Sequence, residues 1–153
     1  MTYASSTIVG KQEWLQSASR ATIALRNELL SRKWPTTSQV DELLGAGPGN
    51  AAEKRQQGAL LGVWADHLQD FVHPLFQFQH GEINPFTTQL LAALAKIPGF
   101  TPVDDPGGWR RVFWLHGAIM ALDNRVPAEV FGVDPQAVIA VARREAISDP
   151  NDW

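Results

Sequence analysis

The sequence contains no cysteine among its 153 residues. This absence excludes disulfide bonds, thiolate metal sites and a cysteine nucleophile, and it is compatible with a reducing cytoplasm. No apolar run approaches the roughly 18 residues that span a bilayer, and the N-terminal stretch Met1–Ser6 has no charged segment followed by an apolar run. We therefore expect a cytoplasmic protein that does not enter a membrane.

The common catalytic and cofactor-binding motifs are also missing. The Gly45–Gly49 cluster has no Lys-Ser/Thr ending and no preceding strand, so it is not a phosphate-binding loop. No Ser-His-acid arrangement stands out, and we expect Asp104 and Asp105, beside proline and glycine, to lie in a solvated loop. None of the four histidines has a metal-ligand spacing such as HExxH; they are His67, His73, His80 and His116. We expect no enzymatic activity, metal or cofactor.

The composition is that of a globular protein. Hydrophobic residues make up 44% and charged residues 19%, a balance too apolar for a disordered chain. The net charge of −3 argues weakly against nucleic-acid binding by the whole chain. Residues 1–65, however, hold seven Lys/Arg and five Asp/Glu, whereas residues 66–153 hold six and eleven. A mildly basic front and an acidic back indicate two kinds of partner.

Helical spacing is clear near the start of the chain. Residues 11–31 place small and apolar side chains on one face, which predicts an amphipathic helix that needs a partner to cover it. The residues on this face are Trp14, Ala18, Thr22, Leu25 and Leu29. Trp34-Pro35 then sets a boundary, because proline disfavours the helical conformation of the residue before it.

Two short helices joined by a glycine-rich turn come next. Thr36, Thr37 and Ser38 are candidate caps of the first helix, and Ser38, with Asp41 three residues later, has the spacing of a capping box. Asn50 repeats the start signal, and the second helix, over residues 51–57, stops at Gly58. Two short capped helices with a turn between them are the plan of a helix-turn-helix.

The second of these helices carries side chains suited to phosphates and base edges. They are Lys54, Arg55, Gln56 and Gln57. Operator DNA is therefore one expected partner. The alternative interpretation, a solvated surface helix, stays open.

Two β-like runs, over residues 60–64 and 71–78, predict a hairpin with its loop at residues 65–70. A hairpin directly after a helix-turn-helix is typical of the winged version. Pro74 cannot donate to a ladder, so the second strand is an edge strand or breaks there. The loop is acidic and polar, with no Lys or Arg, which weakens the expectation that it contacts DNA; it carries Asp66, His67, Gln69 and Asp70.

The remainder of the chain has helical spacing. A helix opening near Asn84-Pro85 has an apolar face that includes Leu90, Leu91 and Leu94. A longer one, from Gly108 to Leu122, is apolar on most sides, so it is either central to the core or exposes an apolar face. We predict a mainly α protein with a helix-turn-helix and wing-like hairpin in residues 1–80 and a helical domain with a C-terminal tail in residues 81–153.

The C-terminal part combines a turn with two helix starts. Asp123-Asn124-Arg125 forms a sharp turn, and Pro127–Phe131 is a short helix with proline in its first turn. Asp134-Pro135 caps a last helix whose Arg143-Arg144 pair points outward. Six tryptophans are many for this length, and tryptophan is common at interface hot spots; Trp109 and Trp114 fill the core or face a partner. Trp153, at the end of a polar tail, is an expected partner-binding anchor.

The run from Leu122 to Phe131, followed by Asp134-Pro135 and residues 138–144, resembles the toxin-binding domain of Xre/MbcA/ParS-type antitoxins. Residues 74–78 and 81–83 resemble the junction ahead of that domain, and the likeness covers roughly residues 34–147. Leu122, Arg125 and Pro127 match the family's shared motif. Asn124 stands where the family favours glycine, and asparagine is the next most tolerant residue for a left-handed backbone.

This resemblance implies an antitoxin that neutralises a RES-type, NAD-consuming toxin by occluding its active site and that represses its own operon. Besides the motif's Arg125, it directs attention to the C-terminal end, where Arg143, Arg144 and Trp153 lie and where the family approaches the toxin's cleft. A palindromic operator would favour a homodimer within a larger toxin–antitoxin assembly. Two alternatives stay open: a DNA-binding regulator without a toxin partner, and an adaptor or immunity-like protein for another effector.

Overall fold

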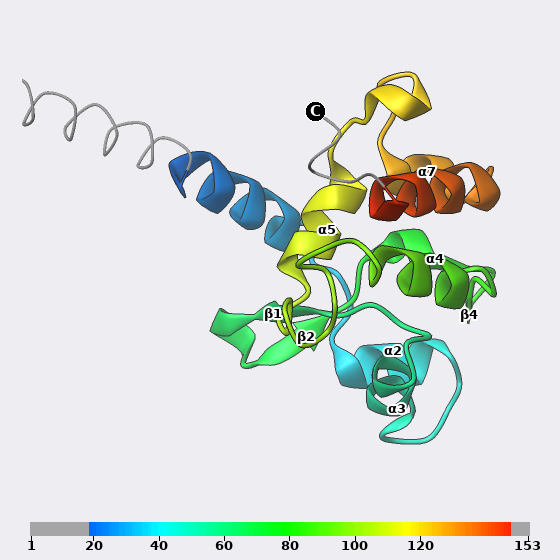
Figure 1. Cartoon of the computed structure of the whole chain (residues 1–153). Helices are drawn as coiled ribbons and strands as arrows, with labels where there is room; N and C mark the ends of the chain where they lie inside the picture. Colours follow the sequence, from blue (N-terminus) through cyan, green and yellow to red (C-terminus); the bar gives the residue numbers. More distant parts are fainter. Residues whose placement is uncertain (1–18, 148–153) are drawn as a thin grey trace, which may run out of the picture. The chain divides into compact units, whose positions relative to one another are not determined.

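A computed structural model describes residues 19–147 (Figure 1). The chain divides into two compact units, Met1–Lys33 and Trp34–Trp153. In the first unit, residues 19–31 are helical, which confirms this part of the predicted helix; Trp14 and Ala18 lie outside the described residues. The expected boundary at Trp34-Pro35 is confirmed, and the division expected near residue 80 falls within the second unit.

The second unit is mainly helical, as predicted, with two small antiparallel sheets of two strands each. Its helices are α2 (Thr37–Leu43), α3 (Asn50–Gln56), α4 (Thr87–Leu94), α5 (Trp109–His116), α6 (Pro127–Phe131) and α7 (Pro135–Ile147). The strands are β1 (Val63–Ala65), β2 (Asp70–Val72), β3 (Phe78–Gln79) and β4 (Glu82–Ile83). Three 3-10 turns complete it: η1 (Asp66–Leu68), η2 (Leu75–Gln77) and η3 (Met120–Leu122).

The first helix of this unit starts at Thr36, one of its three candidate caps, and the second starts at a cap other than the predicted Asn50. α2 begins after Thr36, whose backbone N–H donates to the Gln39 side chain at 2.9 Å, so Ser38 lies inside the first turn. α3 begins after Gly49, whose φ is +88°, and Asn50 is its first helical residue. Glycine has no capping side chain, so the first turn of α3 needs its acceptor from elsewhere.

Asp41, on α2, supplies that acceptor. Its buried carboxylate accepts the backbone N–H of Ala51 at 2.7 Å and that of Gly49 at 3.2 Å. A carboxylate at a helix N-terminus satisfies unpaired N–H groups and matches the helix dipole. One side chain thus fixes the packing of α2 against α3, a role different from its expected place in a capping box.

The predicted hairpin is present, but its strands are shorter than expected. β1 pairs with β2 antiparallel, with Val63 opposite Val72 and Trp64 opposite Phe71. The second predicted strand, over residues 71–78, is interrupted at residues 73–77, where Pro74 precedes the turn η2, which confirms the break allowed for at Pro74. Residues 78–83 form a second hairpin, β3–β4, whose turn residues His80 and Gly81 have φ of +55° and +75°.

The long apolar helix predicted from Gly108 to Leu122 is wrong in its second half. α5 ends at His116, and Gly117 is extended, with φ −107° and ψ 143°. Ile119 explains the break, because its N–H donates to Arg125 O at 3.2 Å and its carbonyl accepts Asn124 N–H at 3.0 Å. These bonds across the following turn use the backbone groups that a continuing helix would need.

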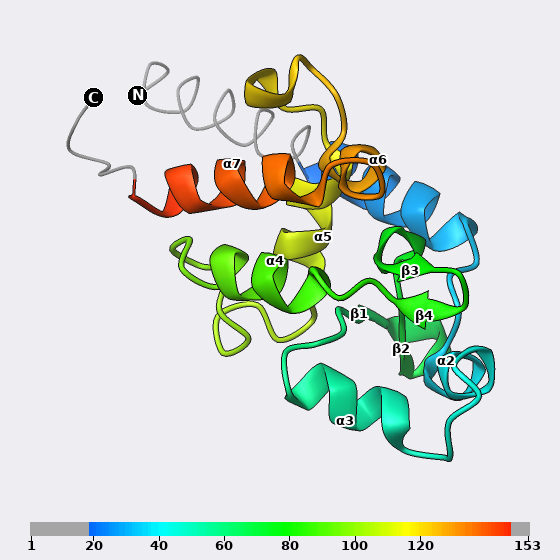
Figure 2. The ribbon, with the colours of Figure 1, turned by 90° about the vertical axis from the view of Figure 1, so that its right-hand side faces the viewer.

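The helical half of the unit packs around α7. α7 packs against α4 and α6, and α6 packs against α5 (Figure 2). The contacts are apolar, and the predicted face of α4 is buried together with residues of α6 and α7; the buried residues include Leu90, Leu91, Leu94, Phe131, Val138 and Ile139. α2 packs against α3 and against β2 (Figure 1), which places the first hairpin beside the helix pair.

Gly108 holds the loop before α5 close to the start of β1. Its φ is +77°, and a Cβ atom there would lie 2.4 Å from the backbone oxygen of Gly62. Gly81 has nearly the same φ, +75°, but nothing within 4 Å of a Cβ position. The two glycines therefore separate the cost of a left-handed backbone from the cost of a steric clash.

We predict that Gly108→Ala destabilises the protein by at least about 2 kcal/mol, because it adds a backbone clash to the strain of a left-handed alanine. Gly81→Ala, the matched control, has only the strain and should cost about 1 kcal/mol. Urea unfolding of both variants and of the unchanged protein measures the difference. An equal loss in the two variants would contradict the close approach of Gly108 to Gly62.

Candidate functional site

Arg55, one of the expected DNA contacts on α3, points into the fold. Its Nη1 donates to Thr37 Oγ1 at 3.0 Å and lies 2.9 Å from His73 Nε2. Its guanidinium lies 4.4 Å from the centre of the Phe71 ring, within the range of a cation–π contact. Arg55 thus joins α3 to α2 and to the first hairpin, a role that the sequence analysis missed.

His73 completes this buried group. Its Nδ1 lies 3.0 Å from the carbonyl oxygen of Pro35, which can only accept, so Nδ1 carries the proton and Nε2 accepts from Arg55. The pKa of His73 is lowered from 6.5 to about 4. Burial is the main cause; the Pro35 bond opposes it, the Arg55 charge adds to it, and Asp70 and Asp41 oppose it weakly. His73 is therefore a neutral imidazole at pH 7, and both of its ring nitrogens have partners, Pro35 and Arg55.

The low pKa of His73 makes stability depend on pH. In the unfolded chain the imidazole binds a proton below about pH 6.5, whereas in the folded protein it does so only near pH 4. The unfolded state therefore gains protons first as the pH falls, and the free energy of unfolding falls with it. We predict a loss of roughly 2 kcal/mol between pH 7 and pH 5 from this group.

Urea unfolding at pH 7, 6 and 5 measures this loss. His73→Gln, which does not titrate, should be less stable at pH 7 and should show a flatter dependence on pH. His67→Gln removes an exposed histidine from the hairpin loop and is the control that keeps the slope. An unchanged slope in His73→Gln would refute the assignment.

The other three expected DNA contacts lie at or near the surface of α3. Gln56 and Gln57 are exposed, and Lys54 is half-buried. Gln57 Nε2 donates to Glu53 Oε1 at 3.2 Å, one turn back on the same face. The outward side of α3 is therefore polar, with Lys54 as its cation near the surface.

The loop of the first hairpin is ordered by its own side chains. Gln69 has φ of +49°, and its Nε2 donates to the backbone oxygen of Asp66 at 2.6 Å. Trp64 Nε1 lies 3.4 Å from Asp66 Oδ1. Acidic and amide groups occupy this tip, which fits poorly against a phosphate backbone.

The turn after η3 has the backbone that Asn124 predicts. Asn124 has φ of +60°, and Asp123 shares the left-handed conformation at +57°, which the sequence analysis did not anticipate. Leu122 is buried beneath the turn, and the exposed Arg125 donates from Nε to the Leu122 oxygen at 2.9 Å. Pro127 is the buried first residue of α6. Leu122, Asn124 and Pro127 therefore shape the turn.

The last helix presents the arginine pair as expected. Asp134 caps α7, since its Oδ1 accepts the Ala137 N–H at 3.2 Å, and Arg143 and Arg144 are exposed near its C-terminal end. The next residue, Glu145, accepts Trp114 Nε1 at 2.6 Å, which ties α7 to α5. Trp114 is thus partly a structural residue. η3 also packs against α7. The other expected contact residue of this end, Trp153, lies outside the described residues.

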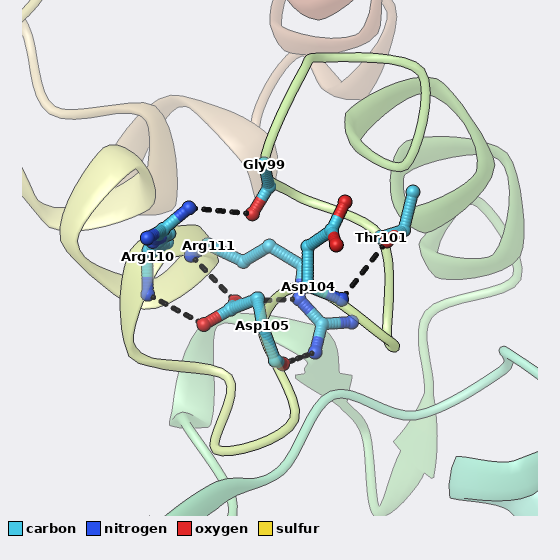
Figure 3. A network of polar contacts seen from close by, with 6 residues as sticks. All are labelled: Gly99, Thr101, Asp104, Asp105, Arg110 and Arg111. Carbon is cyan, nitrogen blue, oxygen red and sulfur yellow. Dashed lines mark hydrogen bonds and ion pairs between the residues drawn. The ribbon is translucent and has the colours of Figure 1, made fainter.

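Asp105 is a buried capping residue, which corrects the expectation of a solvated loop (Figure 3). α5 begins after Gly108, which has no capping side chain. The Asp105 carboxylate accepts Arg110 N–H at 3.1 Å and Arg111 N–H at 3.2 Å, and it forms an ion pair of 3.0 Å with Arg111 Nε. Asp104 stays exposed, as expected.

Gln77 is a second buried polar residue that the sequence analysis missed. Its Oε1 accepts Leu61 N–H at 2.8 Å, and its Nε2 donates to the Leu61 oxygen at 2.8 Å and to the Pro74 oxygen at 3.0 Å. The amide pairs with Leu61 as a neighbouring strand would. The sequence predicts a strand here, because Gln77 lies between the aromatic residues Phe76 and Phe78. Nothing in that pattern indicates a buried glutamine that bonds to the backbone.

Comparisons with protein-family models, with curated proteins and with solved structures found no match to this chain. Among residues 19–147, no helix combines the length and the apolar character needed to cross a membrane. The same residues contain no group of three or more histidine, aspartate or glutamate side chains placed to hold a metal ion.

Proposed function

We propose that this protein is an antitoxin that binds and neutralises a RES-type, NAD-consuming toxin through its C-terminal part. The support is the run from Leu122 to Pro127, which resembles the antitoxin motif and whose left-handed Asn124 stands where that family favours glycine. Arginine is frequent at interface hot spots, and a guanidinium forms paired hydrogen bonds with carboxylates, which an enzyme's surface can supply.

The binding surface of this proposal consists of Arg125, Arg143, Arg144 and Trp153. The first three are exposed in the structure, and charge complementarity at an interface fixes register and speeds association. Leu122, Asn124 and Pro127 hold the turn that precedes α6 and do not contact the toxin themselves. The toxin's active site would be occluded by the end of α7 and the residues that follow it.

We predict that Arg143→Glu weakens toxin binding at least about tenfold, because it replaces an attraction by a repulsion at the interface. Lys96→Glu makes the same charge change on an exposed residue at the end of α4 and is the control. Co-purification with a RES-domain protein encoded next to this chain, and rescue of growth when both are expressed, measure the effect.

Trp153→Ala tests the tail separately and should also weaken the complex. Full rescue and undiminished co-purification in both Arg143→Glu and Trp153→Ala would reject this surface. Failure of the unchanged protein to bind any RES-domain partner would favour the alternatives, a regulator that binds DNA alone or an adaptor for another effector.

We also propose that α2 and α3 act as a helix-turn-helix, with the first hairpin in the place of a wing, and repress the operon by binding operator DNA as a homodimer. The supporting observation is the direct packing of the two short helices. Lys54, Gln56 and Gln57 lie toward solvent and would contact phosphates and base edges, whereas Arg55 would act indirectly by holding α3 in place.

The salt dependence of DNA binding tests this second activity. Lys54→Ala should weaken binding to upstream DNA and reduce the slope of log K against log salt by about one, because one phosphate contact is lost. Lys96→Ala removes a cation outside the helix pair and should leave the slope unchanged. A slope identical in both variants would exclude Lys54 from the DNA contact.

A further inference from the structure

A groove of about 490 Å³ lies between the C-terminal end of α3 and the side of α4. The chain between α3 and β1 and the loop before α5 complete its walls. This volume falls within the roughly 300–1,000 Å³ that small-molecule sites occupy. The groove draws on four segments that are distant in the sequence, so its shape depends on the fold as a whole.

The groove is mostly apolar. Leu60 and Leu61 from the chain after α3, Leu91 from α4 and Phe71 from β2 all line it. The three leucines are buried, and Phe71 is half-buried. The apolar surface still open to a ligand comes from Phe71, Ala92, Ala95 and Pro102, which are half-buried or exposed. A ligand with an aliphatic or aromatic body would replace water along this surface, at a gain of about 25 cal/mol for each Å² covered.

The charged lining residues are all of one sign. Arg55 and Arg111 line the groove, and no aspartate or glutamate does. Their hydrogen bonds within residues 19–147 use Nη1 of Arg55 and Nε and Nη2 of Arg111. Each guanidinium has five N–H donors, so both retain donor capacity beyond these bonds.

The surroundings of Arg55 favour an added negative charge. Burial lowers the pKa of Arg55, and the nearby Asp70 and Asp41 raise it, but burial has the larger effect. A further negative charge beside this guanidinium would act in the same direction as Asp70 and Asp41. Hydrogen bonds between a guanidinium and a carboxylate are strong and fix the orientation of a planar group.

We propose that this groove binds a small carboxylic acid with an apolar body, with its carboxylate toward Arg55 and Arg111 and its body along Phe71, Ala95 and Pro102. The site uses residues other than the proposed toxin-binding arginines. It stands whether or not the partner of this protein is a toxin.

Isothermal titration calorimetry on the full chain tests the proposal with three probes. 1-Naphthaleneacetate has the carboxylate and the apolar body, 1-naphthaleneacetamide has the same body without the charge, and inorganic phosphate has only the charge. We expect the acetate to bind with a Kd on the order of 100 µM and the acetamide at least about tenfold more weakly, because a charge-assisted hydrogen bond is lost. Phosphate should bind more weakly than the acetate, since it covers no apolar surface.

Ala92 provides a matched pair of variants that leaves both arginines in place. It is an exposed residue of α4 that lines the groove, and glutamate and lysine are both good helix formers of similar length. Ala92→Glu should weaken binding of the acetate at least about fivefold, whereas Ala92→Lys should bind it as tightly as the unchanged protein or more tightly. Backbone amide shifts at Gly58 and Gly62, but not at Gly132, would locate the ligand in the groove.

Any of the following results would overturn the proposal. One is equal affinity for the acetate and the acetamide, which would remove the role of the arginines. Another is equal weakening by Ala92→Glu and Ala92→Lys, or phosphate binding as tight as that of the acetate. The last is no binding of the acetate by the folded protein at concentrations up to about 5 mM, some fifty times the expected Kd.

Discussion

The structure depends on side chains that satisfy backbone groups outside their own helix, strand or turn. Its helices and strands are short, so a large share of their N–H and C=O groups lie at element ends, where no regular partner exists. Asp41 supplies acceptors to the start of α3, and Asp105 supplies them to the start of α5. Gln77 pairs with both backbone groups of Leu61. Because unsatisfied buried groups are costly, these residues determine where the elements pack.

The same constraint explains the inward position of Arg55. The segment from Pro35 to α2 and the end of β2 meet beside α3, and the carbonyl of Pro35 faces the imidazole of His73. A neutral imidazole with Nδ1 protonated needs a donor at Nε2, and Arg55 supplies it. Arg55 thereby fixes α3 to its neighbours. The polar surface of α3 is left with Lys54 and the two glutamines, a modest set of groups for attracting DNA.

The sequence predicted the features whose signals are local. Pro127 and Asp134-Pro135 mark helix starts by their own backbone and capping chemistry, and the structure has helices there. The period of α4 predicted its buried face, and that of α7 predicted the outward position of Arg143. The end of α5 was not predictable in this way. It depends on bonds from Ile119 to a turn that the left-handed Asp123 and Asn124 form later in the chain.

The candidate sites also differ in whether a local sequence signal predicts them. An outward arginine on α7 can be predicted from helical spacing, whereas the groove beside α4 cannot, because its arginines are placed by partners on other elements. Arg111 is held by Asp105 across the loop before α5, and Arg55 by Thr37 and His73. In both cases the bond that holds the guanidinium uses only part of its donors. The contacts that stabilise the fold therefore also hold two arginines in the wall of one mostly apolar groove. The ligand site that we propose there is built from residues whose first role is structural.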